Sequence, residues 1–182
     1  MFNEILSKEI IVLGCGNVLF GDDAFGPEVV HRLLASGRLP DRAHAEDVGT
    51  SVRDVLFNIV TLPGRKVELV IVVDAVDVAG RTPGEVFEID VSQMPKVKMA
   101  DFSFHQFPTS NLLHEARELA GVDVRIVAAQ ARSIPDFVQE GMSPEILAAV
   151  DAAADLVVRF CSEHLDAGGT NAQEGQGTRR RR

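Results

Sequence analysis

Carboxylates stand at two places in the sequence where a parallel sheet would bring them together. Asp22 and Asp23 follow a glycine turn, which comes directly after the apolar run Glu9–Gly14 (EIIVLG). Asp74 ends the strongest β-branched run of the chain, Lys66–Asp74 (KVELVIVVD). Ligand sites in open parallel sheets lie beyond the carboxyl ends of the strands. Because an unpaired charge at the end of a buried strand is costly, we expect these carboxylates to serve a site or to be hydrogen-bonded.

Each of these residues also has a purely structural explanation. One member of the Asp22–Asp23 pair could only stabilise the start of the following helix through the helix dipole. Asp74 could be a hydrogen-bonded acid that closes the next turn, and His105, among the phenylalanines of DFSFHQFPTS, could be a packing residue. Two carboxylates and an imidazole would suit a divalent ion such as nickel or zinc. Their spacing in the sequence leaves open whether the three side chains converge.

The two cysteines do not indicate a metal or disulfide framework. Cys15 and Cys161 lie near opposite ends of the chain and form no CxxC pair. A disulfide framework or a zinc knuckle is therefore not expected. We interpret both as packing residues, because no basic group beside Cys15 is evident that would activate its thiol.

The glycine turn invites comparison with a dinucleotide-binding fingerprint. Gly14 and Gly16 match its first two glycines, but Leu19 occupies the third position. The Asp22–Asp23 pair also places negative charge where a pyrophosphate would need free N–H groups. A nucleotide-binding oxidoreductase is therefore a disfavoured alternative.

The elements that must position these residues alternate along the chain. Glu85–Asp90 alternates apolar and polar residues, which is typical of a half-exposed or edge strand. Ser143 is a good cap for the last helix, with Pro144 at its first position. The pattern predicts an α/β fold of three layers, α/β/α, around a twisted, mostly parallel sheet of about five strands. The predicted strands are 9–14, 43–47, 66–74, 85–90 and 123–129, and the predicted helices are 28–36, 52–60, 110–119 and 143–164.

Composition and charge narrow the class of protein. The 182 residues are 46% hydrophobic and 25% charged, which predicts a soluble protein with a single domain, placed at residues 1–165. Residues 166–182, which end in four arginines, are predicted to be a disordered tail. No apolar stretch could span a bilayer and the first residues do not resemble a secretory signal, so a cytoplasmic location is expected. The net charge of −9 disfavours binding to nucleic acid or anionic membranes.

Taken together, the motifs resemble the hydrogenase maturation endopeptidases, which trim the C-terminal tail from the large subunit of nickel–iron hydrogenases. The resemblance runs from about Glu9 to Leu165. It rests on four blocks in the family's order, VLGCGNVLFGDDAFGPEVV, DVGTS, VIVVDAV and SFHQF, with Val48 where the family usually has glycine. The first block is most similar to the branch that serves coenzyme F420-reducing hydrogenases.

The resemblance implies a site, a substrate and a metal. Asp23, Asp74 and His105 would contact nickel, and Asp23 and Asp74 would be the catalytic carboxylates. The nickel would arrive with the substrate, a nickel-loaded large-subunit precursor, and would not be a resident cofactor. A polarised carbonyl, a metal-activated water or a carboxylate base could each drive hydrolysis. A non-enzymatic nickel chaperone would use the same three residues without cutting. The residues implied to support the cleft are Gly14, Gly16, Asn17, Asp22, Gly49, Thr50 and Gln106.

Overall fold

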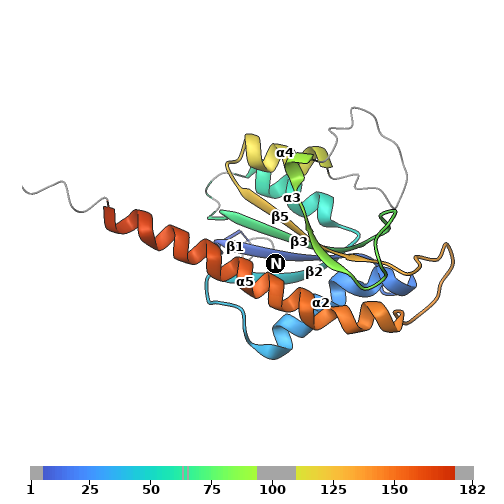
Figure 1. Cartoon of the computed structure of the whole chain (residues 1–182). Coiled ribbons are helices and arrows are strands. Elements are labelled where there is room, and N and C mark those ends of the chain that lie inside the picture. The colour runs from blue at the N-terminus through green and yellow to red at the C-terminus, as the bar shows by residue number, and fades with distance from the viewer. Residues whose placement is uncertain (1–5, 63, 65, 94–109, 175–182) are drawn as a thin grey trace, which may run out of the picture.

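The computed structural model describes residues 6–62, 64, 66–93 and 110–174. A five-stranded sheet lies between two layers of helices (Figure 1). The strands are β1 (Ile10–Cys15), β2 (Ala43–Gly49), β3 (Leu69–Val76), β4 (Val86–Ile89) and β5 (Asp123–Gln130). The helices are α2 (Phe25–Ser36), α3 (Val52–Thr61), α4 (Ser110–Glu118) and α5 (Pro144–Glu174), with 3₁₀ turns η1 (Gly21–Ala24) and η2 (Val91–Gln93). This is the predicted three-layer α/β/α fold.

The strand order is β2-β1-β3-β5-β4. Strand β1 pairs in parallel with β2 and β3, and β3 pairs in parallel with β5. The last strand, β4, runs antiparallel to β5 at the edge of the sheet, which confirms the edge position that its alternating sequence predicted. The carboxyl ends of β1, β2, β3 and β5 therefore point toward the same edge of the sheet.

Hydrophobic cores lie on both faces of the sheet, because β1 and β3 present apolar residues on both sides. Ile10 and Val12 face the core beneath α2 and α5, whereas Ile11 and Leu13 face the core beneath α3 and α4. All six residues of β1 are buried. The continuous apolar run that predicted a central strand is thus explained by burial on two faces.

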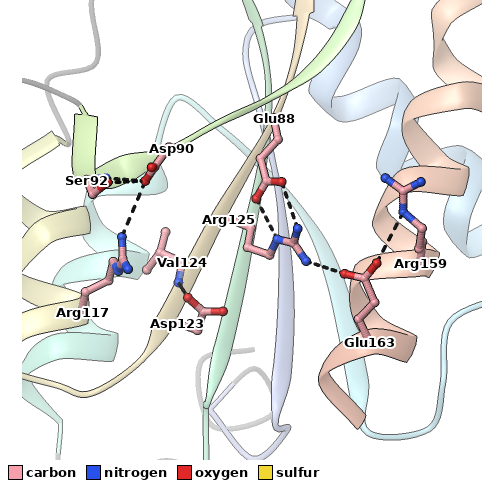
Figure 2. Close-up of polar contacts among 9 residues, drawn as sticks. All are labelled: Glu88, Asp90, Ser92, Arg117, Asp123, Val124, Arg125, Arg159 and Glu163. Carbon is pink, nitrogen blue, oxygen red and sulfur yellow. Dashed lines mark hydrogen bonds and ion pairs between the residues drawn. The ribbon is translucent and has the colours of Figure 1, made fainter. Parts of the chain in front are cut away.

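An arginine in β5 joins the edge strand to the long helix (Figure 2). The guanidinium of Arg125 donates to both carboxylate oxygens of Glu88 in β4, at 2.8 and 2.9 Å, and to Glu163 in α5 at 2.8 Å. It also lies 3.2 Å from the centroid of the Phe160 ring. The hydrogen bond to Glu88 raises the pKa of Arg125 above its usual value, and Glu163 adds to this effect. The cluster holds β4 and α5 together at the side of the sheet away from β2.

The C-terminal end of the last helix differs from the sequence-based expectation. Helix α5 is predicted to end at His164, with a disordered tail from residue 166, but it continues to Glu174 and extends beyond the sheet (Figure 1). Once a helix is established, each further residue adds a backbone hydrogen bond without a new nucleation cost. The four terminal arginines lie outside the described residues. None of the helices that the structure describes is long and apolar enough to cross a membrane.

Candidate active site

The register of the central strands places Asp74 beside the end of β1. Gly14 of β1 lies opposite Val73 of β3, and β3 continues past this point. Asp74 is predicted to end its strand, but β3 runs two residues further because Ala75 and Val76 still pair with β5. Asp74 therefore lies one residue beyond the last pair with β1, next to the turn that leads from β1 to η1.

Asp23 is held in η1 by the turn that follows β1. The backbone N–H of Asn17 donates to Asp23 Oδ2 at 2.7 Å. Gly16 has a positive φ of 126°, and a Cβ on it would lie 1.8 Å from the backbone oxygen of Asp23. Only glycine allows this approach. The Gly16 N–H in turn donates to the carbonyl of Gly49 at 3.1 Å. Of the predicted cleft residues, Gly16 and Asn17 thus contact Asp23, and Gly49 joins them through Gly16. Thr50 follows as an exposed residue.

Asp22 has a different structural role from Asp23. The residue is only 2% exposed. Oδ2 accepts hydrogen bonds from the backbone N–H groups of Arg132 at 2.8 Å and Ser133 at 3.1 Å, and Oδ1 accepts from Ser143 at 2.6 Å. A buried carboxylate with three such donors is well satisfied. Asp22 therefore fastens the loop between β5 and α5 to η1 and leaves Asp23 for the site.

The titration of Asp74 is strongly perturbed. Burial raises its pKa from 3.8 to about 7, and the nearby negative charge of Asp23 contributes to this rise, against a hydrogen bond with the backbone of Ala75 that lowers it. The influence of the Asp23 charge on Asp74 indicates that the two carboxylates lie near each other. Paired carboxylates with a raised pKa are typical of functional sites.

The thiol of Cys15 lies near these carboxylates. Burial raises its pKa well above the usual value, and the charges of Asp74, Asp23 and Asp47 raise it further. A thiol with a raised pKa remains protonated and is a poor nucleophile. The structure therefore agrees with the interpretation of Cys15 as a packing residue.

Sequence reasoning missed two residues at this edge. Asp47, at the carboxyl end of β2, is close enough to influence Cys15, and its Oδ1 accepts a hydrogen bond from the Gly49 N–H at 3.0 Å. Gln130, at the end of β5, donates to Asp77 Oδ1 at 3.0 Å and accepts from the Val78 N–H at 2.9 Å. It fastens the loop after β3 to β5. Both are polar residues at the carboxyl end of an apolar or weakly apolar strand, and that signal could have revealed them.

The third member of the predicted triad is not placed. His105 and Gln106 lie outside the described residues, so the structure brings together Asp23 and Asp74 only. Another possible cation site lies elsewhere. Donor atoms of Glu9, Glu68 and His164 lie within 4.8 Å of one another, near the amino ends of β1 and β3. Glu9 also pairs with Arg42, and both carboxylates lie 3.6 Å from His164. We interpret this group as a cluster of ion pairs.

The raised pKa of Asp74 predicts a pH-dependent gain in stability for Asp74→Asn. The wild-type folded state keeps its proton up to about pH 7, whereas the unfolded state releases it near 3.8, so folding loses stability as the pH rises through this window. The full difference between the folded and unfolded pKa values corresponds to ~4 kcal/mol of stability. Contact with solvent reduces this effect, so we expect the free energy of unfolding of Asp74→Asn to exceed that of the wild type by about 2 kcal/mol at pH 8.

This gain should shrink toward pH 4, where the folded wild type is protonated and the unfolded state is only partly ionised, and it should vanish below the unfolded pKa of 3.8. Urea unfolding of wild type and Asp74→Asn across this range measures it. Asp41→Asn, a change at an exposed carboxylate, serves as the control and should show no comparable trend. A stability difference for Asp74→Asn that does not grow with pH would contradict the assignment.

Comparison with known proteins supports the same family. The profile described as hydrogenase maturation protease matches residues 27–160. A protein of Methanocaldococcus jannaschii named as a hydrogenase maturation protease is 35% identical over 153 residues, which cover 83% of this chain and 95% of the relative. The coenzyme F420 hydrogenase subunit delta of Methanothermobacter thermautotrophicus is 34% identical over 154 residues, covering 82% of this chain and 92% of the relative.

A solved structure agrees with the fold. The crystal structure of a hydrogenase 2 maturation peptidase from a Thaumarchaeota archaeon superposes with a TM-score of 0.56 at 31% identity, covering 84% of this chain and 97% of that one. The α/β fold thus accompanies the sequence similarity over most of both chains. The chain belongs to the hydrogenase maturation protease family and is a hydrolase.

Proposed function

We propose that this chain is an endopeptidase that removes the C-terminal extension of a nickel–iron hydrogenase large-subunit precursor after nickel insertion. The observation that carries the proposal is the convergence of Asp23 and Asp74 at one edge of the sheet, with the pKa of Asp74 raised to about 7. Similarity to the F420 hydrogenase subunit of M. thermautotrophicus favours a coenzyme F420-reducing hydrogenase as the enzyme served. The proposed place of action is the cytoplasm.

The proposed role of nickel is that of a group carried by the substrate. Asp23 and Asp74, with His105 as the proposed third donor, offer oxygen and nitrogen ligands and no thiolate. Such donors bind a first-row ion more weakly than a site that includes thiolates. They would therefore recognise nickel that the precursor already holds without extracting it. This arrangement would restrict cleavage to precursors that have received their metal.

Asp74 is suited to move a proton during hydrolysis. A carboxylate with a pKa near the working pH is an efficient general base. In the proposed step, water attacks the scissile carbonyl and passes a proton to Asp74. That proton then goes to the departing amide nitrogen as the C–N bond breaks. Asp23 orients the nickel-bearing end of the substrate.

The direct test is incubation with the large-subunit precursor followed by intact-mass measurement. We expect loss of the C-terminal extension from nickel-loaded precursor and a rate at least about a hundredfold lower with nickel-free precursor, because an interaction with the metal would be missing in the transition state. His105→Ala should reduce cleavage of the loaded precursor to a similar extent. Elemental analysis of the purified enzyme should find no stoichiometric metal.

Other outcomes would identify other functions. Stoichiometric zinc in active enzyme, or efficient cutting of nickel-free precursor, would indicate an ordinary metalloprotease. Binding of nickel-loaded precursor with no change in its mass would indicate a nickel-binding maturation chaperone. A precursor with its extension already removed is the control, since its mass should stay constant under all conditions.

A further inference from the structure

Four large apolar side chains are exposed on two loops near the carboxyl edge of the sheet. Phe137 and Val138, between β5 and α5, are 66% and 62% exposed. Val18 and Leu19, between β1 and η1, are 50% and 42% exposed. We call these four residues the apolar lip. Exposure of single apolar residues is ordinary, but a group of this kind often marks an interaction site.

The two loops of the apolar lip are fastened to each other. The N–H of Gln139 donates to the carbonyl of Leu19 at 2.8 Å, and the N–H of Gly21 donates to the carbonyl of Gln139 at 2.7 Å. The three hydrogen bonds accepted by Asp22 join the same two segments at neighbouring points. In Figure 1 the orange loop before α5 accordingly passes beside the blue segment that enters α2. The apolar lip is therefore held in place before any partner binds.

The apolar lip is continuous with the proposed active site. The N–H of Leu19 donates to Asn17 Oδ1 at 3.0 Å, and the N–H of Asn17 donates to Asp23 Oδ2 at 2.7 Å. A protein that presents a peptide bond to Asp23 and Asp74 must therefore approach the apolar lip. By contrast, Phe57 and Leu147, which are also exposed, lie within helices α3 and α5.

The charged residues beside the apolar lip indicate which kind of partner surface would bind it. Phe137 and Val138 lie between the exposed acids Asp136 and Glu140. The cation of this loop, Arg132, is paired with Glu145. The chain as a whole also carries a net charge of −9. A partner with apolar side chains next to basic residues fits this surface, because its charges would be complementary.

We propose that the apolar lip docks the segment of the substrate precursor next to the scissile bond, through apolar side chains flanked by basic residues. The inference rests on the proposed function, since that function supplies the protein substrate. Docking outside the residues that are proposed to contact nickel would supply binding energy that holds the scissile bond in position. The apolar lip would then govern affinity, whereas Asp23 and Asp74 govern the chemical step.

The test compares binding and cleavage in matched variants. Binding of nickel-loaded precursor is measured in an Asp74→Asn background so that nothing is consumed, and cleavage is measured in the wild-type background. Phe137→Ala/Val138→Ala should raise both Kd and KM about tenfold, with kcat within about twofold. Phe57→Ala/Leu147→Ala removes apolar side chains that are 56% and 54% exposed, and it should leave both values unchanged.

The contribution of the acidic residues to binding is tested separately, by varying the salt concentration. Between about 50 and 500 mM salt, KM of the wild type should rise, and Asp136→Asn/Glu140→Gln should weaken that dependence. Equal Kd for the lip variant and its control would overturn the proposal, as would sedimentation showing that the apolar lip only joins two copies of this chain. If the precursor binds the wild type through the apolar lip but is not cleaved, the proposed endopeptidase function is wrong, whereas the docking proposal stands.

Discussion

Asp74→Asn is expected to lower the rate of precursor cleavage by at least about a thousandfold, because a neutral amide can neither accept the proton of the attacking water nor offer an anionic donor to nickel. Intact-mass time courses on nickel-loaded precursor measure the effect, and Asp23→Asn should show a similar loss. The thermal stability of Asp74→Asn should not fall, since the change removes a costly buried charge. A rate near that of the wild type would remove Asp74 from the site.

Two further measurements separate this role from a structural one. Asp77→Asn alters a carboxylate only three residues away, whose Oδ1 accepts a hydrogen bond from Gln130, and it should retain activity within about threefold. The wild-type rate should also fall as the pH drops below about 7, because protonated Asp74 loses its function as a base. A rate that stays flat from pH 8 to pH 5 would contradict proton acceptance by Asp74.

Gly26→Ala is expected to destabilise the fold by at least about 3 kcal/mol, because the added methyl group would meet backbone atoms on two strands. Its Cβ would lie 2.2 Å from the carbonyl oxygen of Cys15 and 2.4 Å from that of Val73. No side-chain rotation can relieve these contacts, so the first turn of α2 would have to move away from β1 and β3. Urea unfolding measures the loss, and displacement of η1 should also reduce cleavage.

Gly37→Ala provides the matched control for this substitution. Gly37 ends α2 with a positive φ of 61°, and a Cβ there meets no atom within 4 Å. Only the strain of the left-handed conformation should appear, a loss of about 1 kcal/mol. If Gly26→Ala cost no more than Gly37→Ala, the close packing of α2 on the two strands would be wrong.

Much of the fold could be predicted because it depends on residues near one another in the chain. The apolar run of β1 is buried on both faces, as its continuous pattern indicated, and the alternation in 85–90 correctly indicated an edge strand. The N-terminal cap of α5 was also predictable, since the Ile146 N–H donates to Ser143 Oγ at 3.4 Å. Periodicity and caps are local signals, so the sequence alone contains them.

The position of the site follows from a general rule of parallel sheets together with the motifs. Strand-end carboxylates meet at the carboxyl edge, and this rule alone predicts that Asp23 and Asp74 share one edge of the sheet. The rule does not say which member of the Asp22–Asp23 pair faces the site. That depends on donors 110 to 121 residues further along the chain, which occupy the Asp22 carboxylate.

Tertiary packing decided the chemistry and the surface around the site. Asp74 acquires a pKa near 7 only when folding removes it from water and places it beside Asp23. In the sequence Gly26 is an ordinary glycine at the start of a helix, and only the fold places the backbone of two strands against it. Likewise, Phe137 and Val138 resemble core residues by type, and only the folded chain leaves them exposed beside Leu19. The sequence alone determined which groups reach the edge of the sheet, because strand direction and apolar pattern are local. Their charge state and neighbours depend on desolvation and on contacts between distant segments, which arise only when the chain folds.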